Sequence, residues 1–167
     1  AYVLGSLPFA VIISRLMGLQ DPRTFGSNNP GATNVLRSGN KVAAALTLLG
    51  DLLKGTVAVL IAAQISTRFD LSSTVIACSA IAVFLGHVFP FTLGFKGGKG
   101  VATAIGILIA LQPFLALACA LTWLAIAYIF KYSSLAAIVA ALLAPAYYLL
   151  GAGSTWPMDA PIALAIG

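Results

Sequence analysis

The chain alternates long apolar stretches with short polar ones. The apolar stretches that could form helices in a bilayer fall at residues 1–19, 41–65, 72–89, 101–111, 113–130, 135–150 and from about 161 onward. A helix needs roughly 20 residues to cross a hydrocarbon core of about 30 Å. The pattern therefore predicts an all-α, polytopic membrane helix bundle with seven transmembrane segments, the last of them incomplete.

We expect a single integral-membrane domain over residues 1–167, because no linker or low-complexity stretch divides the chain. The sequence opens at Ala1, without a methionine, directly in apolar residues. Both end segments are short, so they are expected to belong to helices that continue beyond the given sequence. Residues 101–111 are also short for a crossing, and Pro145 is expected to bend the helix that contains it.

Composition supports the membrane assignment. The mean hydropathy is +1.04, 60% of the residues are hydrophobic and 8% are charged. Cys78 and Cys119 lie inside apolar runs, without metal-ligand spacing or a disulfide framework, so we expect neither metal nor cofactor. The net charge of +5 does not indicate nucleic-acid binding, because the basic residues cluster in alternate loops.

The distribution of these charges predicts the topology. If every segment crosses, Arg68 faces one side, and the opposite side holds Arg15, Arg23, Arg37, Lys41, Lys96, Lys99 and Lys131. By the positive-inside rule the richer side is cytoplasmic. We therefore expect the N-terminus outside the cell and two glycine-rich loops together at the cytoplasmic face.

The first glycine-rich loop, residues 26–34, reads GSNNPGATN and precedes Arg37. Short hydrogen-bonding side chains and an arginine, which can grip a phosphate through two nitrogens, predict an anion site. The candidate ligands are Ser27, Asn29, Thr33, Asn34 and Arg37. Asn-Pro-Gly is also a strong turn signal, and Thr33 or Asn34 could simply cap a helix.

The second loop, residues 95–103, reads FKGGKGVAT and leads directly into an apolar helix. Free N–H groups at the helix start and two lysines favour phosphate binding. The candidates are Lys96, Gly97, Gly98, Lys99, Gly100 and Thr103. Lys99 is followed by glycine, so this is not a nucleotide-binding P-loop. The alternative is a flexible turn whose lysines only set topology.

Three ionisable residues fall within apolar helices. Asp51 and Lys54 share a helix face, as a structural ion pair or as a substrate contact. His87, the only histidine, could act as a general base, hold the second loop, or be purely structural. It lacks an aspartate five residues later, and the chain has no glutamate, so an obvious protein base is missing. This favours a reaction whose electrophile is already activated.

In order and spacing, these motifs closely resemble the bacterial acyl-phosphate-dependent glycerol-3-phosphate acyltransferases, the PlsY family. The matching segments are GSNNPGATNVLR at 26–37, DLLKG at 51–55, GHVFP at 86–90 and FKGGKGVAT at 95–103. The resemblance implies a seven-helix enzyme of the bacterial inner membrane. It would transfer a fatty acyl group from acyl phosphate to the sn-1 hydroxyl of glycerol 3-phosphate. The products would be lysophosphatidic acid and phosphate, in the first step of phospholipid synthesis.

The resemblance also implies residue roles. Ser27 and Arg37 match an essential serine and arginine, residues 96–100 match the glycerol-phosphate loop, and Ser134 matches another active-site serine. Two departures stand out: Asn28 replaces a family glycine, and the family's C-terminal motif with histidine and asparagine is absent from the given residues. Substrates and membrane lipids are the expected partners, with no nucleic acid and no obligate protein partner.

The residues suggest a mechanism of positioning and charge stabilisation. The groups expected to supply it are Ser27, Arg37, Lys96, Lys99 and nearby backbone N–H groups. Two other classes of function remain open at this point. A transporter for a phosphorylated solute would also use glycine loops and short helices, and a structural subunit could dock anionic lipids on its basic loops.

Overall fold

The computed structural model describes residues 1–166 and is helical throughout, without a β-strand in that range. One short 3₁₀ turn, η1, spans Phe91–Leu93. The α-helices are α1 (Tyr2–Gly5), α2 (Phe9–Leu16), α3 (Ala32–Leu36), α4 (Lys41–Arg68), α5 (Thr74–Val88), α6 (Val101–Leu111), α7 (Pro113–Phe130), α8 (Ser133–Gly151) and α9 (Ala160–Ile166). The all-helical fold expected from the sequence is confirmed.

The number of predicted membrane crossings is not confirmed. Within the described residues, 4 segments are long and apolar enough to span a bilayer: Lys41–Arg68, Thr74–Leu93, Pro113–Phe130 and Ser133–Gly151. Helix α6 is apolar but has only 11 residues, and α1, α2 and α9 are shorter still.

The expectation of one continuous helix over residues 1–19 is wrong. The chain forms two short helices, α1 and α2, with a break at residues 6–8. Pro8 explains the break, because it has no N–H to donate and disfavours the helical conformation of the residue before it. Pro145 behaves differently: α8 continues through it, so the predicted bend stays a prediction.

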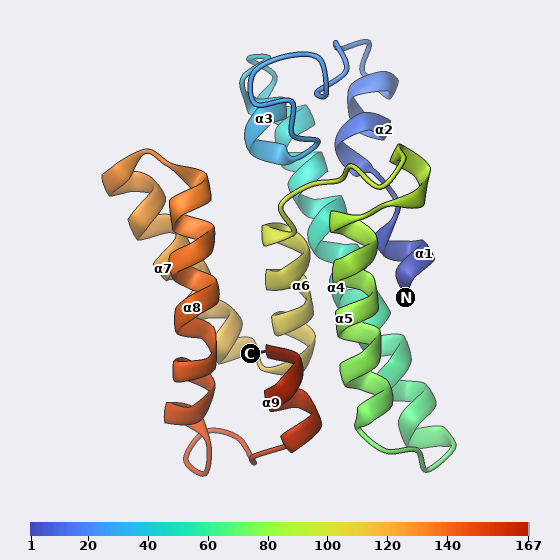
Figure 1. Cartoon of the computed structure of the whole chain (residues 1–167), viewed down its shortest axis with the longest axis vertical. Helices are drawn as coiled ribbons and strands as arrows, with labels where there is room; N and C mark the ends of the chain where they lie inside the picture. The colour runs from blue at the N-terminus through green and yellow to red at the C-terminus, as the bar shows by residue number, and fades with distance from the viewer. Residues whose placement is uncertain (167) are drawn as a thin grey trace.

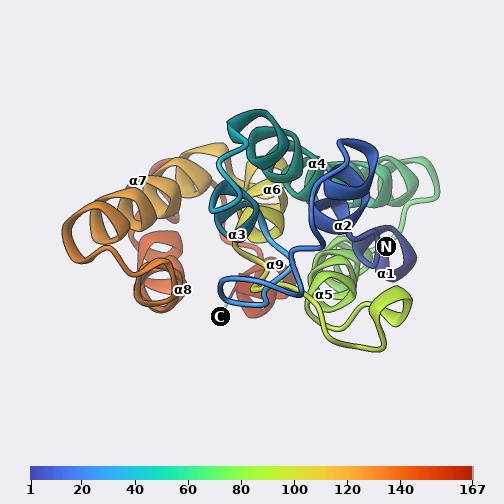
Figure 2. The ribbon, with the colours of Figure 1, turned by 90° about the horizontal axis from the view of Figure 1, so that it is seen from above.

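The helices place the polar loops at one end of the molecule. Figure 1 shows α3, the α2–α3 loop, the α5–α6 loop and the α7–α8 turn at the upper end, and the α4–α5 and α8–α9 turns at the lower end. Seen from above, α6 lies near the centre, and α7 and α8 form a pair to one side of it (Figure 2). The basic loops predicted to share a side therefore lie at the same end.

Helices α4 and α6 approach until their backbones touch. A Cβ atom on Gly106 would overlap the carbonyl oxygen of Leu52, and one on Gly55 would overlap that of Thr103. The hydroxyl of Thr56 also donates to the carbonyl of Gly106 at 2.8 Å. Small residues allow such close packing in membrane proteins, where van der Waals contact and hydrogen bonds replace the hydrophobic effect between helices. This contact fixes the position of α6 and of the glycine loop before it.

We predict that Gly106→Val destabilises the protein by about 3 kcal/mol or more, because the new side chain would force α4 and α6 apart. The thermal unfolding midpoint in detergent measures the effect. Ile109→Val places the same residue on the exposed face of α6 and is expected to leave the midpoint nearly unchanged. Equal midpoints for both variants would show that the helix contact is not rigid.

Candidate active site

The two glycine-rich loops converge at the upper end of the bundle. A small pocket there is lined by residues of the first loop, the second loop, the α1–α2 break and the buried charges. The lining includes Leu7, Pro8, Pro30, Asp51, Lys54, His87, Gly97 and Gly98. The structure thus brings Pro30 of the first loop close to Gly97 and Gly98 of the second, although Leu7 and Pro8 were not expected beside them.

The first loop turns sharply through left-handed residues. Gly26 has φ of 60° and Asn28 has φ of 54°. Asparagine enters this region more readily than other non-glycine residues, so Asn28 can replace the glycine of the resembling family without losing the turn. Helix α3 then begins after Gly31, which places Thr33 inside the helix rather than at its cap.

Asn34 holds the first loop from within. Its Oδ1 accepts a hydrogen bond from the Ser27 N–H at 3.0 Å, and its Nδ2 donates to the carbonyls of Pro22 at 2.6 Å and Phe25 at 3.1 Å. Its side chain is fully buried and all its donors are used. This geometry shows that Asn34 holds the loop in place; a contact with substrate stays a prediction.

The remaining first-loop candidates lie at the surface. Ser27, Thr33 and Arg37 are exposed, and Asn29 is partly buried. The Arg37 guanidinium packs over Gly26, since a Cβ atom there would lie 3.3 Å from an Arg37 terminal nitrogen. Arg37 and Ser27 therefore border the same turn.

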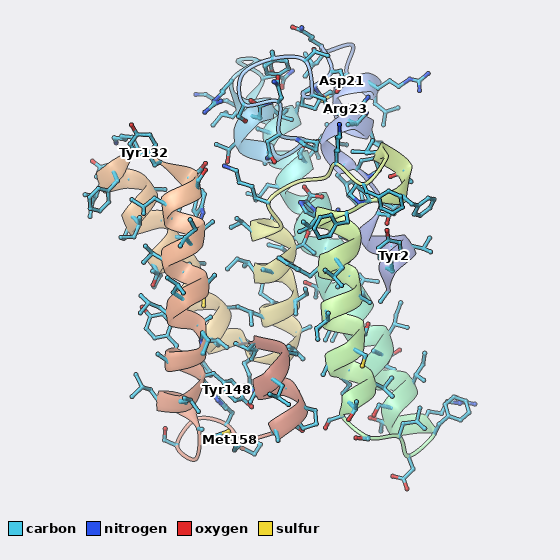
Figure 3. All side chains as sticks on the ribbon, in the orientation of Figure 1. Tyr2, Asp21, Arg23, Tyr132, Tyr148 and Met158 are labelled. Atoms are coloured by element: carbon cyan, nitrogen blue, oxygen red, sulfur yellow. The ribbon has the colours of Figure 1, made fainter. Side chains whose placement is uncertain are left out.

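The only carboxylate of the first polar segment, residues 20–40, is already paired. Asp21 and Arg23 form an ion pair with 2.6 Å between Oδ2 and the guanidinium, and the hydrogen bonds from Arg23 hold the pKa of Asp21 below its ordinary value. Figure 3 shows both side chains in the upper loop region. Arg37, Lys96 and Lys99 have no carboxylate partner within residues 1–166. This end of the bundle therefore carries unneutralised positive charge suited to an anion.

The second loop folds back onto the end of α5. The N–H groups of Gly97 and Gly98 donate to the carbonyls of Val88 at 3.0 Å and His87 at 3.2 Å. A side chain on Gly97 would overlap the His87 carbonyl, and one on Gly98 would overlap the His87 imidazole. The two glycines are needed for this close approach, and their N–H groups are occupied rather than free for a phosphate.

The free N–H groups lie one step further along, at the start of α6. Gly100, with φ of 79°, is the N-cap and has no side chain to satisfy the first helical turn. Those N–H groups lack partners within the helix and carry a partial positive charge. Lys99 stands immediately before them, and its Nζ donates to the Ser134 Oγ at 2.5 Å. Two residues that the sequence separates by 35 positions are therefore adjacent.

The intramembrane charges are buried and paired. Lys54 Nζ lies 2.8 Å from Asp51 Oδ1, and both residues are 3% exposed. Lys54 also donates to the carbonyl of Leu7 at 2.9 Å, which the break at Pro8 leaves without a helical partner. The sequence left open a structural pair or a substrate contact. The Lys54 ammonium contacts Asp51 and the Leu7 carbonyl at the break between α1 and α2, and these contacts support the structural alternative.

His87 and Thr103 extend this buried cluster. The Thr103 hydroxyl donates to the backbone carbonyl of Asp51 at 3.0 Å and lies 3.1 Å from His87 Nδ1. Because that hydroxyl proton is committed, we assign the His87 tautomer protonated on Nδ1, with Nε2 directed at Gly98. Thr103 is fully buried, and its hydroxyl joins α6 to α4; its role in phosphate binding stays a prediction.

An apolar cavity of about 330 Å³ adjoins the second loop. Lys99 and Gly100 line one part of it, and the rest is lined by apolar side chains of α5, α6, α7, α8 and α9, among them Phe84, Leu108 and Ala144. The sequence did not predict this cavity, although the alanines of residues 136–144 hint at a helix face with room beside it.

The fold and the site define a class: an all-helical membrane protein with a cationic loop cluster beside an apolar cavity. A sequence model of the family "Glycerol-3-phosphate acyltransferase" matches residues 1–167, and the chain belongs to this family. It is an acyltransferase of the PlsY type. This assignment favours the enzyme over the transporter and lipid-docking alternatives.

Named relatives and solved structures agree with the assignment. The chain is 62% identical to the glycerol-3-phosphate acyltransferase of Bordetella petrii, over 99% of this chain and 77% of the relative. It is 64% identical to that of Dechloromonas aromatica, over 90% and 74%. The crystal structure of PlsY, an integral membrane glycerol 3-phosphate acyltransferase, in its glycerol 3-phosphate form has 40% identity and a TM-score of 0.83, covering 99% of this chain and 80% of that one. Its lysophosphatidic acid form has 38% identity and a TM-score of 0.82, with 99% and 79% covered.

We predict that Lys54→Met lowers the free energy of unfolding by about 3–5 kcal/mol, because it leaves Asp51 buried and unpaired. The double variant Asp51→Asn/Lys54→Met removes both charges and should recover part of this loss. Thermal unfolding in detergent provides the comparison, with Lys41→Met at the exposed start of α4 as control. Equal losses in the single and double variants would argue against coupling of the two charges.

Proposed function

We propose that the protein transfers a fatty acyl group from acyl phosphate to the sn-1 hydroxyl of glycerol 3-phosphate. The observation that carries the proposal is the approach of Pro30 in the first basic loop to Gly97 and Gly98 in the second, in a chain of the glycerol-3-phosphate acyltransferase family. Two anionic head groups need cations, and a fatty tail needs hydrocarbon, so the arrangement suits both substrates. The relative PlsY, solved in glycerol 3-phosphate and lysophosphatidic acid forms, supports the acceptor and the product.

The choice of donor is supported by the chemistry of acyl phosphate and by the pairing, within the described residues, of the acidic residues near the site. Acyl phosphate is a mixed anhydride, so its carbonyl carbon is already electrophilic and phosphate is a stable leaving group. The sequence contains no glutamate, Asp21 is paired with Arg23, and Asp51 is buried against Lys54. In the proposed step the glycerol oxygen forms a bond to the acyl carbon, the bond from that carbon to the phosphate oxygen breaks, and the departing phosphate takes the hydroxyl proton.

The exposed cations hold the two head groups in position. Arg37 and Ser27 border one turn and would grip one phosphate, and Lys99 with Ser134 and the α6 N-terminus would hold the other, with Lys96 adding charge. Alignment of reactants and stabilisation of developing charge supply the rate enhancement. His87 acts here by supporting Gly98, so we propose a positioning role for it and not the catalytic one that its sequence position allowed.

We further propose that the protein resides in the bacterial inner membrane with this site facing the cytoplasm. The first polar segment, the second loop and the α7–α8 turn, which carry most of the cations, share one end of the bundle, and α4 ends at Arg68 near the other. The positive-inside rule assigns the cation-rich end to the cytoplasm. With that orientation we propose that the N-terminus of the protein faces outside; Ala1, the first residue given, lies at mid-height of the bundle (Figure 1).

We predict that Arg37→Ala lowers kcat/KM by about 100-fold or more, as expected for loss of a charge that stabilises the transition state. Arg37→Lys should recover only part, because a lysine cannot bind a phosphate through two parallel hydrogen bonds. Initial rates of lysophosphatidic acid formation measure both effects. Arg23→Ala, in the same polar segment but in an exposed ion pair, is the matched control and should change the rate little. Unaltered turnover in Arg37→Ala would remove Arg37 from the site.

We predict that membranes or purified protein supplied with glycerol 3-phosphate form lysophosphatidic acid from acyl phosphate, with one inorganic phosphate released per product. Acyl-CoA and acyl-carrier protein, tested in parallel, should give no product. Positional analysis of the product should find the acyl group at sn-1. Turnover from acyl-CoA alone would contradict the proposed donor.

A further inference from the structure

We propose that one water molecule is bound in the small pocket between the α1–α2 break, α4 and the second glycine-rich loop, and that it connects the Asp51–Lys54 pair to that loop. The water accepts a hydrogen bond from Lys54, and it donates to the Asp51 carboxylate and to a backbone carbonyl of Gly97 or Gly98. This binding site is independent of the proposed reaction, because it rests on the size of the pocket and on the groups that line it.

The pocket has the size of a single water molecule. The centre of a water has about 10 Å³ available to it there, which is close to the smallest volume that holds one water. All of the lining residues fall between Gly5 and Gly98, so the pocket is formed by α1, α4, α5 and the loops around them. A phosphate or a larger head group does not fit into this volume.

Lys54 has a hydrogen-bond donor to spare. An ammonium group carries three N–H donors. One donates to the Leu7 carbonyl at 2.9 Å, and Asp51 Oδ1, 2.8 Å from Nζ, takes a second. The Phe9 ring, with its centroid 5.8 Å from Nζ, attracts the charge but offers no oxygen or nitrogen acceptor. Because the Lys54 side chain is buried, its third donor needs a partner inside the pocket that Lys54 lines.

The Asp51 carboxylate has acceptor capacity to spare. Its two oxygens offer about four acceptor positions. Both described partners approach the same oxygen, since Lys54 Nζ lies 2.8 Å and His87 Nδ1 3.5 Å from Oδ1. Oδ2 has no hydrogen bond or ion pair within residues 1–166, although the side chain is only 4% exposed. A buried carboxylate oxygen without a donor is costly, and a water hydrogen satisfies it.

The second loop supplies a further acceptor. The N–H groups of Gly97 and Gly98 are already bonded to carbonyls of α5, but within residues 1–166 no hydrogen bond reaches the carbonyl oxygens of these two glycines. Both glycines line the pocket. A water that accepts from Lys54 and donates to Asp51 and to one of these carbonyls has three partners, the usual number for a buried water.

The charges around the pocket favour water over an ion. Lys54 places a positive charge beside the space, so a metal cation would be repelled there, and Asp51 repels an anion in the same way. The lining needs a neutral molecule that both donates and accepts hydrogen bonds. Water is the molecule of this size that does so.

The test is a crystal structure of the full chain at a resolution that shows individual waters. Wild type should show one water within hydrogen-bond distance of Lys54 and Asp51. The double variant Asp51→Asn/Lys54→Met should lose it, because methionine has no N–H to donate and both charges are gone. Lys41→Met, at the exposed start of α4, is the control and should keep the water. An ion, a side chain or no density in the wild-type pocket would overturn the proposal, and a water retained in the folded double variant would overturn its assigned partners.

Hydrogen exchange tests the connection to the second loop. Loss of the water should raise the exchange rates of the Gly97 and Gly98 amides about 10-fold or more in the folded double variant, the scale of one lost hydrogen bond to a charged group. Rates in α7 should stay at the wild-type level, which separates this local effect from general destabilisation. Unchanged rates at residues 95–100 would overturn the connection. If the double variant does not fold, the wild-type structure still decides whether the water is bound.

Discussion

The position of the site depends on the buried contact between Lys54, Asp51 and the backbone of Leu7. In hydrocarbon an unsatisfied carbonyl costs several kcal/mol, and Pro8 creates a helix break that would leave such groups. Lys54 donates to Leu7, and the Thr92 hydroxyl donates to the neighbouring Ser6 carbonyl at 2.6 Å. The break is therefore held by side chains from α4 and from the turn after α5. Without these donors the carbonyls of Ser6 and Leu7 would lose their side-chain hydrogen bonds, and the break beside the pocket would be less stable.

The same cluster connects the interior of the bundle to the second glycine-rich loop through a series of contacts. Asp51 faces Lys54 on one side, and its backbone accepts the Thr103 hydroxyl, which lies against His87. The His87 carbonyl accepts a hydrogen bond from the Gly98 N–H, and the His87 ring packs against Gly98. Charges inside the bundle are thus paired and serve the fold, whereas Arg37, Lys96 and Lys99 lack acidic partners in the described chain. Burial separates the charges that build the site from those available to a ligand.

Some helices could be predicted from local signals alone. Helices α6 and α7 have the predicted bounds, because Gly100 and Pro113 mark helix starts without help from distant residues. The break at Pro8 has a local cause, the proline itself, but the partner that satisfies the Leu7 carbonyl could not be predicted, because Lys54 lies 47 positions away. The hydrogen bonds by which Asn34 holds its loop could not be predicted either, because the Pro22 carbonyl is 12 positions away. No local pattern distinguishes an asparagine that binds substrate from one that braces its own loop.

The apolar cavity also could not be predicted from local sequence, because it depends on which faces of distant helices meet. Alanines are common in membrane helices and usually let helices pack closely, as the glycines of α4 and α6 do here. On α8 the alanines at 137, 140, 141 and 144 line the same cavity as Ala165 and Ile166, at the end of the described chain. Lys99 lies at one end of that space and is hydrogen-bonded to Ser134, at the start of α8. One lysine thus joins the second glycine-rich loop to the start of α8, a contact between residues 35 positions apart that no local pattern in the sequence predicts.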